Sequence, residues 1–220
     1  MLVNVPAADV MLAGDLTVPP HPCGIVLFAH GSGSSRQSPR NQLVARELND
    51  AAPPLATLLI DLLTEEEEGR DRWDAHLRFD IGLLARRLIA VTDWLTMHGT
   101  PGLPVGYFGA STGAGAALVA AAERPDAVVA IVSRGGRPDL AGAALERVRA
   151  PTLLLVGSND PLVIDLNEMA ARVIPAEVVL DVIPGASHLF EEPGKLAEVA
   201  RRATRWFHRY LGGAVTSAYA

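Results

Sequence analysis

A serine between two glycines is the clearest candidate for a reactive group in this sequence. Residues 105–116 read VGYFGASTGAGA, so Gly109, Ser111 and Gly113 form the pattern Gly-x-Ser-x-Gly. An apolar segment precedes the pattern and an alanine-rich segment follows it, which predicts a sharp strand-to-helix turn that exposes the serine hydroxyl. The alternative is a glycine-rich turn that only packs a helix or binds a phosphate.

Two other residues have the types and the chain order that such a serine needs. A serine hydroxyl is a weak nucleophile near neutral pH and depends on a general base that a carboxylate orients. Asp160 and His188 each follow an apolar segment. Asp160 could instead be a turn former ahead of Pro161, but the order serine, acid, histidine predicts a catalytic triad of Ser111, Asp160 and His188.

Acyl transfer also needs backbone amides that stabilise the negative oxygen of the intermediate. Thr112 directly follows the candidate nucleophile and is predicted to give one amide. Ser32 is predicted to give the second, with Gly33 as the alternative, because both follow the pair His30-Gly31 after an early apolar segment. His30 itself is predicted to orient this loop, and a direct catalytic role for it is the competing interpretation.

Three arginines are candidates for substrate binding. Arg36 and Arg40 lie between the His30 loop and the first predicted helix, and Arg134 follows the apolar segment 127–132. A guanidinium group binds a carboxylate through two parallel hydrogen bonds. These arginines are therefore predicted to hold an acidic group of a substrate, unless they pair with surface carboxylates instead.

The elements that must position these residues alternate along the chain. Short apolar segments predict strands buried on both faces, at 24–29, 55–60, 105–108, 127–132, 152–156 and 178–183. Helical patterns between them begin at Ser38-Pro39 and span 72–97, 113–122, 140–148, 162–172 and 193–211. This alternation predicts an α/β fold with a mostly parallel, doubly wound sheet flanked by helices, in which ligands bind at the carboxyl ends of the strands.

The other segments predict a simple domain organisation. The 220 residues, 49% of them hydrophobic, are expected to form a single domain spanning 1–220. Segment 7–18 predicts an antiparallel edge strand or hairpin, and the acidic run 65–68 predicts a solvated loop. Residues 132–151 leave room for one short helix, so no large cap domain is expected, and the site should be open and its substrate small.

Composition excludes several classes of partner. The net charge of -6 argues against nucleic acid, whose phosphates are bound mainly by Lys and Arg. The single cysteine, Cys23, forms no intramolecular disulfide, and the first residues lack the pattern of a signal peptide. No apolar run reaches the roughly 18 residues of a membrane helix. A cytoplasmic protein without a membrane partner is therefore expected, as a monomer or a homodimer.

The sequence resembles the α/β-hydrolase superfamily, and within it the dienelactone hydrolase-like group, from about Gly24 to Leu211. The resemblance rests on four motifs: HGSG at 30–33, GASTG at 109–113, GSNDP at 157–161 and GASH at 185–188. It implies hydrolysis of small carboxylic esters or lactones through an acyl-enzyme, without a metal or organic cofactor.

One residue departs from the pattern of the resembled group. True dienelactone hydrolases carry a cysteine nucleophile, so Ser111 favours a serine esterase. An acyltransferase or amidase with the same triad, or a hydrolase-fold binding module without turnover, are the alternatives. Similar chains also occur joined to phosphoribosyltransferase domains, of which this sequence is expected to contain nothing.

Overall fold

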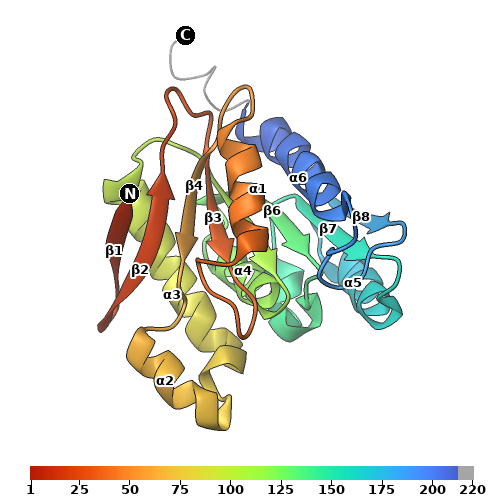
Figure 1. Cartoon of the computed structure of the whole chain (residues 1–220), viewed down its shortest axis with the longest axis horizontal. Coiled ribbons are helices and arrows are strands. Elements are labelled where there is room, and N and C mark those ends of the chain that lie inside the picture. Colours follow the sequence, from red (N-terminus) through yellow and green to blue (C-terminus); the bar gives the residue numbers. More distant parts are fainter. Residues whose placement is uncertain (213–220) are drawn as a thin grey trace.

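A mostly parallel sheet of eight strands forms the centre of the computed structural model, which describes residues 1–212 (Figure 1). The strand order is β1-β2-β4-β3-β5-β6-β7-β8. The bounds are β1 Leu2–Ala7, β2 Val10–Thr17, β3 Ile25–Ala29, β4 Ala56–Ile60, β5 Val105–Ala110, β6 Val128–Arg134, β7 Thr152–Gly157 and β8 Val178–Ile183. Strands β3 to β8 pair in parallel, and only β2 runs antiparallel to both its neighbours. The predicted sheet is confirmed, and segment 7–18 is antiparallel as predicted, but it forms only the second strand of a hairpin that begins at Leu2.

Helices cover both faces of the sheet. One face packs against α1 (Pro39–Asn49) and α6 (Lys195–Leu211), and the other against α3 (Ile81–Trp94) and α4 (Thr112–Glu123). On the second face, the 3-10 helix η3 (Pro138–Arg147) packs beside α4, and α5 (Pro161–Val173) packs against η3.

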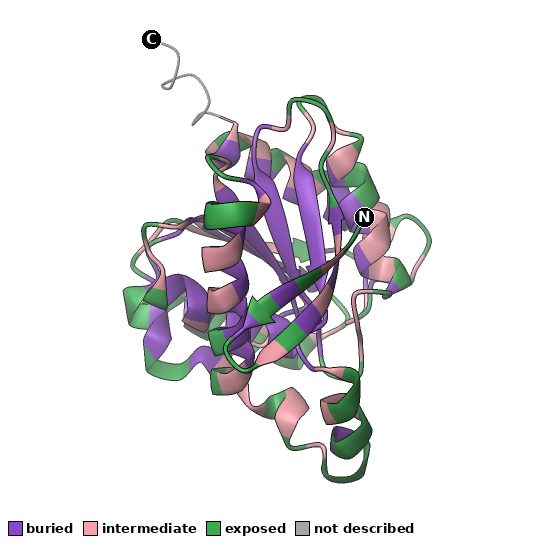
Figure 2. Ribbon diagram, turned by 90° about the vertical axis from the view of Figure 1, so that its left-hand side faces the viewer, coloured by how far each residue is buried: buried purple, intermediate pink, exposed green. Residues whose placement is uncertain are grey.

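Side chains of one strand alternate between the two cores. In β3, Ile25 and Leu27 point into the α3 and α4 core, and Val26 and Phe28 point into the α1 and α6 core. The buried strands lie between the two layers of helices in Figure 2. Burial on both faces explains why these strands read as continuous apolar runs.

The segment between β6 and β7 leaves the site uncapped. It contains the 10-residue η3, which a non-helical Gly142 interrupts, where a regular helix over 140–148 was predicted. Across residues 1–212 no separate cap domain is evident. The same residues contain no helix long and apolar enough to span a membrane.

The prediction for residues 65–97 was wrong in detail. The acidic run 65–68 is not a solvated loop but the first turn of α2 (Glu65–Asp74). The Thr64 hydroxyl accepts the Glu67 N–H, and the Glu67 carboxylate accepts the Thr64 N–H at 2.8 Å. This capping box and the favourable position of acidic groups at a helix N-terminus stabilise α2.

The single helix predicted over 72–97 is likewise divided. Helix α2 ends at Asp74, and the φ of 54° at its C-cap residue, Ala75, is left-handed. A short 3-10 turn, Leu77–Phe79, precedes α3, and a π-helical turn, Leu95–Gly99, follows it. The division lets α2 project beside the carboxyl ends of the strands, at the bottom of Figure 1.

Candidate active site

Ser111 lies in a strained turn between β5 and α4. Its φ of 50° and ψ of -122° fall in a region that side-chain-bearing residues rarely adopt. The neighbouring glycines make the turn possible, because a Cβ at Gly113 would lie 2.3 Å from the Ala29 carbonyl oxygen, and one at Gly109 would lie 2.5 Å from the Ala114 Cα. The predicted strand-turn-helix context of Ser111 is therefore present.

Asp160 and His188 meet beyond the ends of β7 and β8. The Asp160 Oδ2 and His188 Nδ1 atoms are 2.7 Å apart. A carboxylate only accepts, so Nδ1 carries the proton in this pair. In the neutral imidazole, Nε2 is then left with a lone pair, which is the form that a general base requires.

The loops of the acid and the histidine are tied together by their own hydrogen bonds. The Ser158 Oγ accepts the Gly185 N–H at 2.7 Å, and the Asn159 N–H donates to the Ala186 carbonyl at 2.9 Å. These contacts fix the loop of Asp160 against the loop of His188. Sequence analysis missed Ser158, whose partner lies 27 positions away in the chain.

A third loop connects Ser111 with His188. The Ser111 N–H donates to the Arg134 carbonyl at 3.4 Å, and the Arg137 N–H donates to the Ser111 carbonyl at 3.1 Å. A Cβ at Gly135 would lie 3.5 Å from the His188 Nδ1. Within residues 1–212 no hydrogen bond joins the Ser111 hydroxyl to His188.

The two predicted oxyanion residues, Ser32 and Thr112, lie side by side, but the Ser32 amide already donates a hydrogen bond within the protein. Thr112 is the first residue of α4, so its backbone N–H points out of the helix N-terminus. The Ser32 N–H donates to the Thr112 Oγ1 at 2.9 Å. Ser32 therefore lies beside Thr112 with its amide bonded to the Thr112 hydroxyl, and the assignment of both residues to an oxyanion hole stays a prediction.

His30 holds the loop that carries Ser32. Its Nε2 accepts the Leu62 N–H at 3.1 Å, and its Nδ1 donates to the Gly31 carbonyl at 3.0 Å. Burial lowers the pKa of His30, against the opposing effects of the Gly31 hydrogen bond and the Asp61 carboxylate. Both ring nitrogens are used in the neutral form, in agreement with a loop-orienting residue.

The three candidate arginines differ in what they contact. Arg36 forms an ion pair with Asp61 and another, at 3.4 Å, with Asp15. Two carboxylates thus hold its guanidinium group, which favours the alternative that Arg36 pairs with protein carboxylates over a role in substrate binding. Arg40 pairs with Glu191 at 3.0 Å and keeps one face toward the site.

Arg134 is a buried cation without a carboxylate partner among residues 1–212. It ends β6, in register with Ala110, the residue that precedes Ser111. Only 7% of it is exposed, and its Nε has no hydrogen-bond partner in the described chain. Burial, together with the nearby Arg40, lowers its pKa to about 10, so the group remains cationic near neutral pH.

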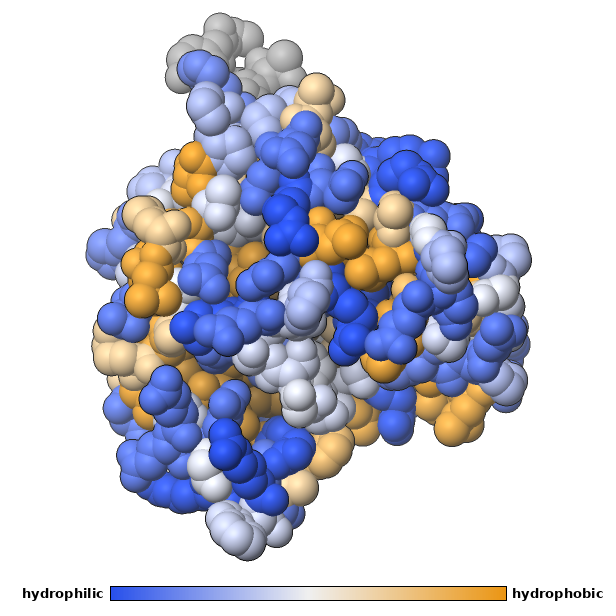
Figure 3. Space-filling view, in the orientation of Figure 1, coloured by the Kyte–Doolittle hydropathy of each residue, from blue (hydrophilic) through white to orange (hydrophobic). Residues whose placement is uncertain are grey.

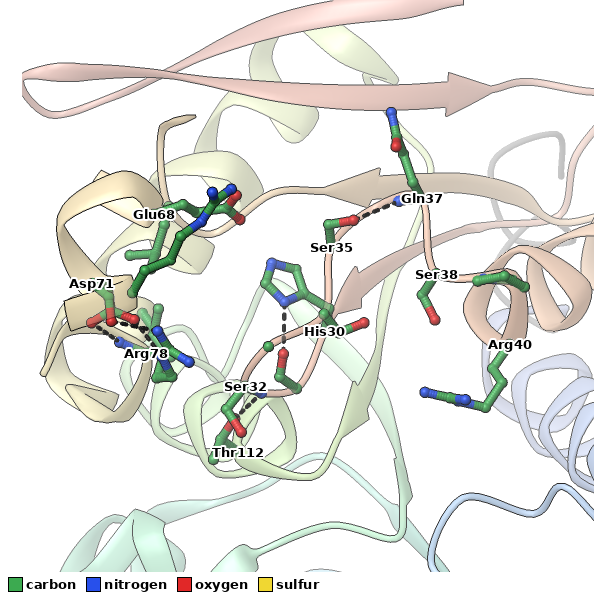
Figure 4. A pocket seen from close by; sticks show the side chains of 17 residues that line it. His30, Ser32, Ser35, Gln37, Ser38, Arg40, Glu68, Asp71, Arg78 and Thr112 are labelled. Carbon is green, nitrogen blue, oxygen red and sulfur yellow. Dashed lines mark hydrogen bonds and ion pairs between the residues drawn. The ribbon is translucent and has the colours of Figure 1, made fainter. Parts of the chain in front are cut away.

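A cavity of about 530 Å³ opens beside the oxyanion residues and extends toward α2 (Figure 4). Hydroxyl groups of the 32–38 loop and Thr112 line one wall, and the opposite wall is formed by residues from α2 to α3: Glu68, Asp71, Arg72, Arg78 and Leu84. The surrounding face is mainly hydrophilic (Figure 3). Sequence analysis missed the α2 wall, although the Thr64 to Glu67 capping box could have revealed it.

Comparisons with known proteins show the family and the fold of this chain. The model of the "Dienelactone hydrolase family" matches residues 64–212. A solved dienelactone hydrolase from Anabaena variabilis is 60% identical, with a TM-score of 0.93, over 96% of this chain and 97% of that chain. An alpha-beta serine hydrolase homologue from Coxiella burnetii, 19% identical, shares the fold with a TM-score of 0.75 over 93% of this chain and 96% of that chain.

The curated relatives are longer proteins. A Mycobacterium tuberculosis protein of strain H37Rv, named "Putative phosphoribosyl transferase", is 60% identical over 212 residues, which are 96% of this chain and 46% of that protein. The chain thus spans about half the length of the curated relatives it matches. Together with the family match and the Anabaena structure, the fold and the strand-end geometry show that this chain belongs to the dienelactone hydrolase family.

Proposed function

We propose that the protein hydrolyses small carboxylic esters or lactones through an acyl-enzyme on Ser111. Membership of the dienelactone hydrolase family supports hydrolase activity. The observation that carries the finer proposal is the 2.7 Å contact between Asp160 and His188, beside a serine in strained backbone geometry. These are the parts that acyl transfer to a serine requires.

The proposed reaction has two halves. His188 Nε2 takes the Ser111 proton as the hydroxyl attacks the carbonyl carbon, and Asp160 stabilises the imidazolium that forms. The Thr112 amide, at the N-terminus of α4, stabilises the oxyanion. His188 then protonates the leaving alcohol, and a water molecule, activated by His188, releases the acid from Ser111.

Labelling with a fluorophosphonate probe tests the proposal directly. We expect the folded protein to gain one phosphonyl group, and peptide mapping to place it on Ser111, because only an activated serine reacts at a useful rate. Heat-unfolded protein is the control and should remain unlabelled. An unlabelled folded protein would instead favour a hydrolase-fold binding module without turnover.

Arg134 supports a preference for substrates that carry an acidic group. A buried guanidinium without a counterion gains much from a carboxylate, because charge-assisted hydrogen bonds are strong where water is excluded. Arg134 ends the strand beside that of Ser111, and Arg40 adds a second positive charge near it. The proposed substrates are therefore esters or lactones that bear a carboxylate.

Replacing Arg134 with methionine should remove this preference. For the mono-p-nitrophenyl ester of succinate we expect KM to rise about tenfold or more, from the loss of a charge-assisted hydrogen bond. For the neutral p-nitrophenyl butyrate, KM should stay unchanged. Arg36→Gln is the matched control, since Asp61 and Asp15 hold that guanidinium. Equal KM changes for both esters in R134M would contradict an anion site.

A further inference from the structure

The Thr112 hydroxyl accepts a hydrogen bond but donates none to the described residues. Its oxygen accepts the Ser32 N–H at 2.9 Å. Within residues 1–212 the hydroxyl proton of Thr112 has no acceptor. The hydroxyl groups of two other threonines differ in this respect: Thr92 donates to the Leu88 carbonyl at 2.8 Å, and Thr204 donates to the Ala200 carbonyl at 2.9 Å. The Thr112 side chain can therefore donate one hydrogen bond that the protein itself does not use.

The position of Thr112 in its helix explains this difference. A threonine inside a helix donates to the carbonyl four residues earlier, as Thr92 and Thr204 do. Thr112 is the first residue of α4, so no helical carbonyl lies four residues before it. The residue four positions earlier, Phe108, belongs to strand β5.

Thr112 lies on the wall of the cavity and directly follows Ser111 in the chain, although Ser111 and His188 themselves do not line that cavity. Thr112 is 4% exposed, yet it lines the cavity together with Ser32. Figure 4 shows the contact between the two residues at the edge of this cavity. The free N–H groups and the dipole of α4 favour negative charge at this helix end. An oxygen that becomes negative beside the Thr112 amide is thus the natural acceptor for the hydroxyl.

We propose that the Thr112 hydroxyl is itself an oxyanion donor and that the Ser32 amide acts through it. The inference rests on the proposed ester hydrolysis. As Ser111 attacks, the carbonyl oxygen accepts hydrogen bonds from both the amide and the hydroxyl of Thr112. The Ser32 N–H, by donating to the same hydroxyl, polarises it and strengthens its bond to the oxyanion. No proton is transferred in this relay.

Thr112→Val tests the inference because valine has nearly the same shape without the hydroxyl. For p-nitrophenyl acetate we expect kcat to fall about 100-fold with KM little changed, as for the loss of one oxyanion donor. Thr112→Ser, which keeps the hydroxyl, should stay within a few-fold of the wild type. Thr204→Val is the control for exchanging a threonine that donates only inside a helix.

A tetrahedral inhibitor separates oxyanion binding from a general loss of structure. Phenylboronic acid forms a tetrahedral adduct with an active serine, so T112V should weaken its binding by about the same factor as kcat. If T112V does not fold, Thr112→Ala serves in its place. Full activity or tighter boronate binding in the variant would overturn the inference, since the freed Ser32 amide would then act directly.

This result is distinguishable from a failure of the proposed function. If ester hydrolysis is wrong, the wild-type protein itself shows neither turnover of p-nitrophenyl acetate nor labelling of Ser111. If only the role of the hydroxyl is wrong, the wild type is active and labelled, and T112V retains that activity.

Discussion

Ser111→Ala is expected to lower the hydrolysis of p-nitrophenyl acetate by about five orders of magnitude, to the residual rate that binding and oxyanion contacts alone provide. The loss is this large because no acyl-enzyme forms without the hydroxyl. The measurement is kcat at pH 8, with enzyme high enough to detect the residual rate. Fluorophosphonate labelling of the same variant should also disappear.

The fold of this variant should be unchanged. Within residues 1–212 the Ser111 hydroxyl makes no hydrogen bond, and alanine bears the same strain at φ 50° as serine. Thermal unfolding should therefore give the same midpoint as the wild type. Wild-type turnover in a folded Ser111→Ala variant would contradict the assignment of the nucleophile.

The parts of the site that could be predicted from the sequence are those set by local patterns. The turn at Ser111 follows from glycines placed where a Cβ would collide with Ala29 or Ala114. The positions of Asp160 and His188 follow from strand ends in a parallel sheet, which meet at one edge. Because each of the two residues follows a predicted strand, the sequence alone could place both at the carboxyl edge of the sheet.

The parts that could not be predicted depend on pairs that lie far apart in the chain. Asp61 accepts a hydrogen bond from Arg36, which lies 25 positions away in the chain. The Thr112 hydroxyl accepts the Ser32 N–H, which lies 80 positions away. A sequence pattern shows which residues can form hydrogen bonds, but not which partner takes them. Helix α2 was missed for another reason: its polar sequence lacks an apolar face, and its capping box provides the main local signal for a helix.

The carboxyl edge of the sheet combines two features that cost stability. Ser111 holds a strained backbone, at a cost on the order of 1 to 3 kcal/mol, and Arg134 keeps a buried charge without a described counterion. Arg134 ends β6 in register with Ala110, and Ser111 directly follows Ala110 at the end of the neighbouring strand β5. Costs of this kind concentrate at sites selected for binding or reaction, which favours turnover over a purely structural role for this edge.

Asp160→Asn is expected to lower kcat for p-nitrophenyl acetate by about 1,000- to 10,000-fold near neutral pH. The amide of asparagine can donate to Nδ1, which would place the imidazole proton on Nε2, where the Ser111 proton must be accepted. The helix that follows should be unaffected, because asparagine starts helices as well as aspartate does and the Asp160 side chain makes no capping bond.

Asp165→Asn is the matched control for this substitution. Asp165 lies exposed on the same helix, α5, and should tolerate the exchange with full activity. Circular dichroism and the thermal midpoint check that both variants fold alike. If Asp160→Asn retains activity within about tenfold of the wild type, Asp160 serves mainly as the turn residue before Pro161, and another group must orient His188. A loss confined to kcat would instead identify the 2.7 Å contact as the one that fixes the tautomer of the base.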